Sequence, residues 1–104
     1  MLVINRFAGP GPGFAADAEA VRKFWLSRPG CLNVEVVQNL DDPALFAVVS
    51  SWADVGSYRR SFQGVEAKLL LTPFFAACLD EPSAYLPASE LGANVPRGES
   101  SPSR

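Results

Sequence analysis

The stretch from Pro29 to Trp52 limits the possible folds of this chain more than any other. It contains two apolar runs, Cys31 to Leu40 and Leu45 to Trp52, with Asp41-Asp42-Pro43 between them. Apolar and polar residues alternate in the first run, and the second is rich in β-branched and aromatic residues, which is typical of strands joined by a turn. We therefore predict an antiparallel hairpin. A hairpin is only marginally stable alone, so further strands and a cover must come from the flanking segments.

The second run of the hairpin has two largely apolar faces. One face carries Phe46, Val48, Ser50 and Trp52, and the other carries Leu45, Ala47, Val49 and Ser51. A strand of this kind is covered on both sides. Helices of the chain can cover one side, and no segment is left for the other. We therefore expect a homodimer that forms through the open face of the sheet.

A short strand is predicted at the N-terminus, from Leu2 to Phe7. One face carries Val3, Asn5 and Phe7, so Asn5 is a polar residue in an otherwise apolar row. Its amide can bind a carbonyl or an oxyanion, or it can be a buried asparagine bonded to backbone. The segment from Ala8 to Gly13 has two prolines and three glycines and is expected to be a connecting loop. Its spacing fits neither GxGxxG nor GxxxxGKS.

Two helices are predicted with clear ends. From Phe14 to Ser27, apolar residues recur at helical spacing, and Arg28-Pro29-Gly30 ends the helix. Asp54 is a good N-cap for a shorter helix from Val55 to Phe62.

The C-terminal part of the domain is harder to assign. The segment from Val65 to Leu71 is expected to be a helical turn or irregular. A short helix is predicted from Phe74 to Leu79, with Pro73 at its first position. The last strand is predicted from Ser83 to Pro87, at an edge of the sheet because proline lacks an N–H.

The order of the predicted elements is βαββαβ, which is the ferredoxin-like arrangement of an α+β domain. It predicts one antiparallel sheet with helices on one face. We expect one domain over residues 1–88. Residues 89–104 are rich in glycine, serine and proline and lack aromatic residues, so a flexible tail is predicted there.

The composition argues against several classes of function. The net charge is −2 with a pI near 5.0, so nucleic acid is not an expected partner. No apolar run approaches the ~20 residues that cross a bilayer, so no membrane partner is expected. Histidine is absent, which removes the commonest general base and metal ligand, and no metal is expected. The N-terminus has no secretory leader, so Cys31 and Cys78 are expected to be reduced thiols in a cytoplasmic protein.

The succession of motifs resembles the antibiotic biosynthesis monooxygenase family over roughly residues 2–87. The motifs are PGCL at 29–32, a strand through Glu35 and Val36, Asp41-Asp42-Pro43, and FAVV at 46–49 leading to Trp52 and Asp54. The resemblance implies that two ferredoxin-like domains pair into a dimeric α+β barrel.

The resemblance also implies an activity. The family includes cofactor-independent monooxygenases that act on polycyclic phenols, and haem-degrading enzymes. The haem-degrading branch uses an asparagine on the first strand, which Asn5 matches, together with a tryptophan and a histidine in the second helical region. The corresponding positions near Ser61 and Phe62 have neither, so haem is not expected. We expect an oxidoreductase that needs no cofactor and oxidises an aromatic polyketide-like or quinol substrate with molecular oxygen.

A substrate pocket between the sheet and the helices is implied by the same resemblance. Asn5 would hold a carbonyl or oxyanion, Ser50 and Tyr58 would hydrogen-bond other oxygens, and Trp52 would stack. The expected lining is Phe7, Phe24, Phe46, Val48, Ser50, Trp52, Tyr58 and Phe62. The same side chains also suit a hydrophobic core.

Two alternatives remain open at this point. One is a non-catalytic dimeric barrel that binds a small apolar molecule. The other is a polyketide cyclase-like enzyme, which needs a general base. Glu35 is the only carboxylate in the middle of a predicted core strand, and it qualifies if it lies buried beside the pocket with a raised pKa. A pocket filled by Phe24, Phe62 and Phe74 would count against binding of any ligand.

Overall fold

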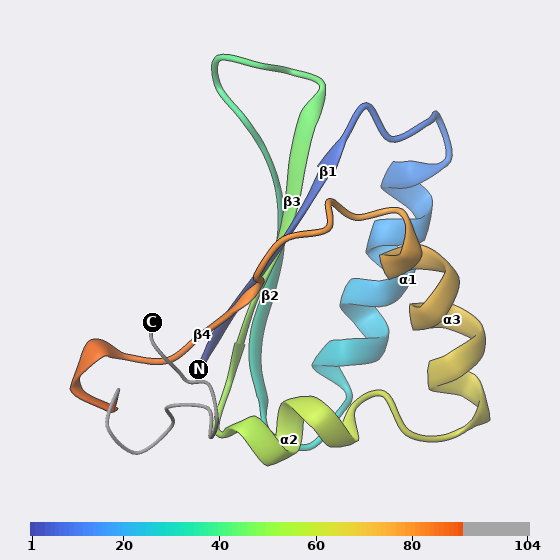
Figure 1. Cartoon of the computed structure of the whole chain (residues 1–104). Coiled ribbons are helices and arrows are strands. Elements are labelled where there is room, and N and C mark those ends of the chain that lie inside the picture. The colour runs from blue at the N-terminus through green and yellow to red at the C-terminus, as the bar shows by residue number, and fades with distance from the viewer. Residues whose placement is uncertain (91–104) are drawn as a thin grey trace.

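The computed structural model describes residues 1–90 of the chain, so most of the predicted tail lies outside the described residues. Figure 1 shows the succession of strands and helices along the chain. The elements are β1 Leu2–Ala8, α1 Phe14–Leu26, β2 Cys31–Gln38, β3 Leu45–Trp52, α2 Val55–Arg60, α3 Val65–Ala76, β4 Ala84–Tyr85 and a 3₁₀ turn at Ala88–Glu90.

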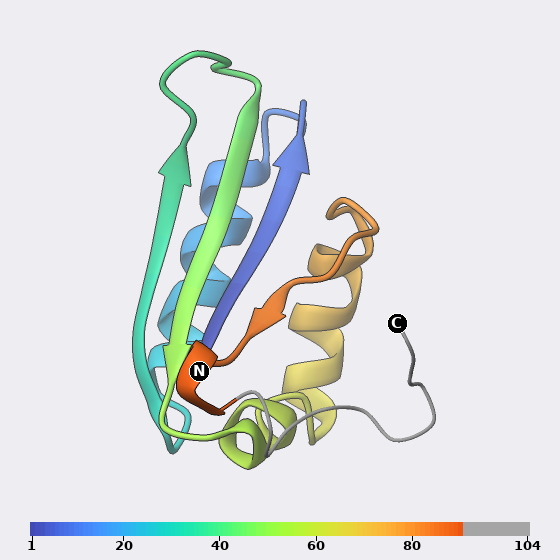
Figure 2. The same cartoon turned by 60° about the vertical axis from the view of Figure 1, so that its left-hand side comes forward.

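The strands form one antiparallel sheet in the order β2-β3-β1-β4 (Figure 2). Asn5 of β1 lies opposite Val48 of β3, and Val34 of β2 lies opposite Ser50. This is the ferredoxin-like topology, so the α+β fold predicted from the sequence is confirmed. The predicted hairpin is present, with β3 bounded as expected and β2 two residues shorter than the apolar run.

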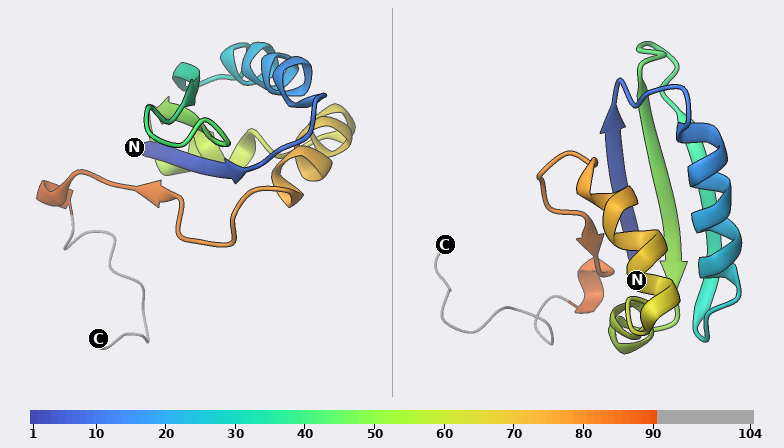
Figure 3. Two further views of the ribbon diagram at one scale, coloured as in Figure 1. Left: turned by 90° about the horizontal axis from the view of Figure 1, so that it is seen from above. Right: turned by 90° about the vertical axis from the view of Figure 1, so that its right-hand side faces the viewer.

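The helices lie on one face of the sheet, and α1 and α3 run side by side over it (Figures 1 and 3). Alternate strand residues point toward them: Val3 and Phe7 on β1 and Val48 and Trp52 on β3 are almost fully buried. The core also contains Val21, Trp25, Val34, Ala67 and Leu71. Burial of these apolar side chains is the main stabilising term of the domain.

The C-terminal region differs from the sequence-based prediction in two ways. The segment predicted as a helical turn or irregular and the predicted short helix after it form one helix, α3, and Pro73 lies inside it instead of at its start. The helix continues through the proline because Ala67 and Leu71 bury one of its faces in the core, which outweighs the lost backbone hydrogen bond. The predicted last strand shrinks to two residues, Ala84 and Tyr85.

The opposite face of the sheet has no helix over it (Figure 2). Ile4, Ala47 and Val49 on this face are partly exposed, and Val37 is 40% exposed. This is the face through which we expect a second copy to bind, and the dimer stays a prediction. Among the described residues, no helix is long and apolar enough to cross a membrane.

Candidate functional site

Asn5 is the polar residue that β1 places between the sheet and the helices. The alternation of the strand puts it on the same face as Val3 and Phe7, and its side chain is only 8% exposed. Among the described residues, its Oδ1 atom has no hydrogen-bond partner. An unpaired buried acceptor costs about 1–3 kcal/mol, so each such group in a folded protein calls for an explanation.

The β3 residues of the predicted site form a second wall. Val48 and Ser50 are fully buried, and Trp52 is 1% exposed. The Nε1–H of Trp52 donates to Oγ of Ser50 at 2.9 Å. This bond uses the Ser50 oxygen as an acceptor and leaves its O–H as the group that can reach a ligand.

Aromatic rings fill the layer between Trp52 and the helices. Trp25 of α1 lies edge-on to Trp52 at 5.3 Å between ring centroids and stacks on Phe75 of α3 at 5.0 Å. Tyr58 and Phe62 contact Trp25 edge-on from the helical region after β3. Burial raises the pKa of Tyr58, and the nearby Cys78 raises it further. In this conformation the rings pack as a core, which is the structural role considered for them from the sequence.

The remaining predicted residues lie at the two ends of this layer. Phe7 contacts Phe14 and Phe74, and Phe46 contacts Phe14 at 5.2 Å between centroids. Phe24 is partly buried under the guanidinium of Arg28, which lies 5.4 Å from its ring centre. The assignment of the whole set to a ligand pocket stays a prediction.

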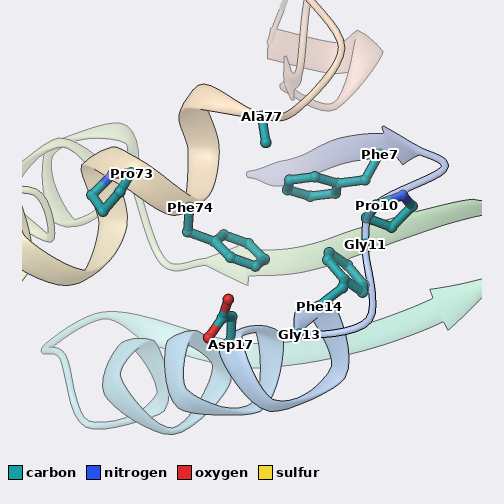
Figure 4. A pocket seen from close by; sticks show the side chains of 9 residues that line it. All are labelled: Phe7, Pro10, Gly11, Gly13, Phe14, Asp17, Pro73, Phe74 and Ala77. Atoms are coloured by element: carbon teal, nitrogen blue, oxygen red, sulfur yellow. The ribbon is translucent and has the colours of Figure 1, made fainter.

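A cavity of about 240 Å³ opens at the Phe7 end, between the start of α1, the end of α3 and the loop after β1 (Figure 4). Its lining consists of Phe7, Pro10, Gly11, Gly13, Phe14, Asp17, Pro73, Phe74 and Ala77. The walls are mostly apolar, with three phenylalanine rings, and the Asp17 carboxylate is their charged group. Phe7 belongs both to this cavity and to the set predicted from the sequence.

Sequence reasoning missed several residues here. Asp17 was not among the predicted site residues, and Phe74 could not be oriented because α3 was predicted as two pieces. Cys78 was expected only to be a reduced thiol. In the structure, the backbone N–H of Leu79 donates to the carbonyl of Arg6 at 2.8 Å, which fixes the segment after α3 against β1. The pKa of Cys78 is raised mainly by burial, while a hydrogen bond from Asn5 acts in the opposite direction.

Glu35 does not meet the condition for a general base of the site. It lies opposite Val49, on the open face of the sheet, and is exposed. Nδ2 of Asn33 donates to its carboxylate at 3.0 Å. The sheet therefore separates Glu35 from the aromatic layer, and the condition set for the cyclase alternative is not met. Within residues 1–90, no cluster of three or more His, Cys, Asp or Glu side chains is arranged to hold a metal ion.

Solved structures share the fold at low sequence identity. SnoaB, a cofactor-independent oxygenase from Streptomyces nogalater, superposes with a TM-score of 0.64 and 19% identity, over 75% of this chain and 82% of its own. A conserved protein from Methanosarcina mazei gives a TM-score of 0.64 and 21% identity, over 80% of this chain and 84% of its own. No match was found among curated protein sequences.

The topology and the aromatic interior with one buried amide define a small ferredoxin-like α+β domain. The family model described as antibiotic biosynthesis monooxygenase matches residues 2–69, and this chain belongs to that family. The resemblance seen in the sequence is thereby confirmed, and it indicates a monooxygenase-type function.

Proposed function

We propose that the protein is a cofactor-independent monooxygenase that oxidises an aromatic polyketide-like or quinol substrate with molecular oxygen. The observation that carries this proposal is the Asn5 amide, which is buried in an aromatic layer with its oxygen unpaired among the described residues. The family supplies the reaction class. The substrate lies between the sheet and the helices, where aromatic side chains cover its ring faces.

The proposed reaction requires few catalytic groups from the protein. A deprotonated anthrone or quinol is electron-rich enough to reduce oxygen by itself. For an anthrone, the methylene carbon loses two hydrogens and gains one oxygen atom, and the second oxygen atom leaves as water. The protein therefore needs to orient the substrate through a polar group and exclude bulk water from the reacting carbon.

The cavity at Phe7 is the entrance to this layer. At about 240 Å³ it is smaller than the roughly 300–1,000 Å³ of typical ligand sites, so a tricyclic substrate requires ring movement. Phe74 lines both the cavity and an adjoining hollow that reaches Leu69 and Leu70, so rotation of its side chain lengthens the site.

The test is oxygen consumption by metal-free protein supplied with an anthrone. The wild type should consume oxygen well above the buffer rate, and Asn5→Ala should lower kcat/KM at least ~10-fold, since loss of one hydrogen bond to substrate costs about 1.4 kcal/mol or more. Gln63→Ala is the matched control, because Gln63 is an exposed amide after α2, outside both the predicted lining and the open face of the sheet.

Two results would count against the proposal. Equal losses of kcat/KM in Asn5→Ala and Gln63→Ala would show that Asn5 does not bind the substrate. No uptake over a panel of anthrones and quinols would exclude the oxygenase. Ligand-dependent quenching of tryptophan fluorescence in the same protein would then favour the alternative, a barrel that binds a small apolar molecule.

We also propose that the functional unit is a homodimer formed through the open sheet face. This proposal is supported by the partly exposed apolar residues on that face, such as Ile4 and Val49.

A further inference from the structure

Asp17 is the charged side chain at the mouth of the cavity at Phe7. It lies in the first turn of α1, is exposed, and points toward Phe74 of α3 (Figure 4). Asp17 also lines the adjoining hollow beside Leu69 and Leu70. Within residues 1–90, none of the ion pairs involves Asp17, and no lysine or arginine lines either hollow. Its carboxylate is therefore available to a ligand.

Three phenylalanine rings form the wall next to this carboxylate. The ring centroid of Phe7 lies 5.1 Å from that of Phe14 and 4.9 Å from that of Phe74, and Phe14 and Phe74 are stacked at 5.7 Å. The face of an aromatic ring carries partial negative charge and attracts cations. Aromatic rings beside a carboxylate are therefore suited to an ammonium group attached to an apolar body.

The ends of two helices determine the remaining electrostatics of the cavity. Helix α3 ends beside it, with Ala77 as its C-cap in the lining, and its last turn has no basic residue. The C-terminal end of a helix carries roughly half a negative charge, which favours a cation. The N-terminal end of α1, at Gly13, has the opposite polarity, and the full negative charge of Asp17 outweighs it. The cavity should therefore favour cations over anions.

The volume of the cavity limits the apolar body of such a ligand. An apolar cavity of about 150 Å³ holds one benzene ring. The cavity at Phe7, at about 240 Å³, is therefore large enough for a benzyl group without movement of the surrounding rings.

We propose that the cavity at Phe7 binds an amine with an aromatic body, and that Asp17 is the specificity-determining residue. The ammonium group donates to the Asp17 carboxylate, and the aromatic body packs against the three phenylalanine rings. This inference rests on the proposed function, because the cavity is the entrance to that site. It deepens the proposed function by naming the charge of the substrate, which is a basic molecule instead of an aromatic carboxylate.

The test compares three probes of similar size and different charge: benzylamine, benzyl alcohol and benzoate. Their dissociation constants for wild type, Asp17→Asn and Glu19→Gln would be measured at neutral pH and low salt by NMR titration of isotope-labelled protein. The largest shifts should occur at backbone amides of the lining, namely Gly11, Gly13 and Ala77. Wild type should bind benzylamine at least ~5-fold more tightly than benzyl alcohol, and benzoate more weakly than either.

The two variants separate a contact with Asp17 from the effect of net charge. Asp17→Asn keeps the shape of the side chain and should lower the ratio of the two affinities at least ~3-fold, because hydrogen bonds between charged groups are stronger than neutral ones. Glu19→Gln removes the same charge from α1, but Glu19 pairs with Arg22 and lies outside the lining, so the ratio should not change. Both positions are exposed, so both variants should fold.

Four outcomes would overturn the proposal. The first two are no binding of benzylamine at millimolar concentration and equal affinity of wild type for benzylamine and benzyl alcohol. The third is a ratio that falls equally, or not at all, in Asp17→Asn and Glu19→Gln. The fourth is a set of amine-induced shifts confined to residues outside the lining, which would place the amine elsewhere.

These measurements do not depend on turnover. If oxygen uptake is absent but the preference for benzylamine and its loss in Asp17→Asn are observed, the oxygenase proposal fails and the amine site stands. If uptake is present and the preference is absent, the amine site fails and the oxygenase proposal stands.

Discussion

At the scale of single residues, Gly30 is tightly packed in the turn between α1 and β2. Its φ is +85°, a left-handed conformation that other residues adopt only with strain. An added Cβ would also clash with the side chain of Ser57, which is buried at the start of α2. The backbone N–H of Ala53 donates to the Gly30 carbonyl at 2.8 Å, so the same corner anchors the chain after β3.

Gly30→Ala should therefore destabilise the domain by about 2–4 kcal/mol in urea unfolding, the sum of backbone strain and a steric clash. Gly9→Ala is the matched control. Gly9 has a φ of +58° with open space around its Cβ position, so it should lose only about 1 kcal/mol from backbone strain. Similar losses in the two variants would show that the Ser57 contact is unimportant.

At the scale of elements, a side-chain ion pair adds to the short backbone pairing of the last strand. Ala84 and Tyr85 pair with β1, and the backbone N–H of Ile4 donates to the carbonyl of Ser83 at 2.7 Å. Just before them, Glu81 receives two hydrogen bonds from Arg6, each at 2.7 Å, in the forked geometry that favours arginine–carboxylate pairs. The hydrogen bond from Arg6 lowers the pKa of Glu81, and the same bond raises the pKa of Arg6.

The Arg6–Glu81 pair predicts a direction for the pH dependence of stability. Because the pKa of Glu81 is lower in the folded state, the unfolded chain binds more protons as the solution is acidified. The stabilisation is present above the ordinary pKa of 4.5 and is lost as pH falls through the lower folded value. Thermal unfolding of Glu81→Gln should therefore show a smaller drop in Tm than wild type between neutral pH and pH of about 3. Parallel curves would contradict the prediction.

Helix α3 offers a second prediction at this scale. Pro73 lies in its interior and is exposed, so it removes one backbone hydrogen bond without burying its ring. Pro73→Ala should raise the free energy of unfolding by about 1–3 kcal/mol, measured in urea. Thr72→Ala, at the exposed neighbouring position, should change it by less than ~0.5 kcal/mol. No gain in Pro73→Ala would mean that contacts of the proline ring offset the missing backbone hydrogen bond.

At the scale of the whole molecule, the two faces of the sheet differ in whether helices cover them. One is covered by α1 and α3, and the other has no helix over it (Figure 2). The uncovered face carries partly exposed apolar side chains such as Ile4 and Val49. The β2–β3 turn extends beyond the helices (Figure 1), and Leu40 in this turn is fully exposed. Apolar surface of this kind on a small domain is typical of an interface between subunits.

A lysine at the centre of the open face should prevent association. Val49→Lys should weaken the dimer at least ~10-fold, because a charge would be buried without a partner, and sedimentation velocity should detect the monomer. Leu69→Lys, on the exposed side of α3, should leave the dimer intact. A wild type that is monomeric at micromolar concentration would contradict the dimer.

Some of this protein follows from local sequence alone. Alternation predicted β1, β2 and β3 and the faces of their residues, and helical spacing with Arg28-Pro29-Gly30 predicted α1 to within one residue. These patterns are local consequences of periods of 2.0 and 3.6 residues. The family resemblance then followed from the order of the motifs.

Other features depend on contacts between distant segments, and only the tertiary structure decided them. The sequence favoured a new helix starting at Pro73. In the structure, one helix continues past Pro73 because Ala67 and Leu71 are buried in the core. Glu35 was considered as a general base, and its position on the open face of the sheet excludes it from the aromatic layer. The cavity at Phe7 joins residues about 70 positions apart, such as Phe7 and Ala77. Local periodicity cannot predict such contacts, because they arise only when the helices pack on the sheet and exclude water from between them.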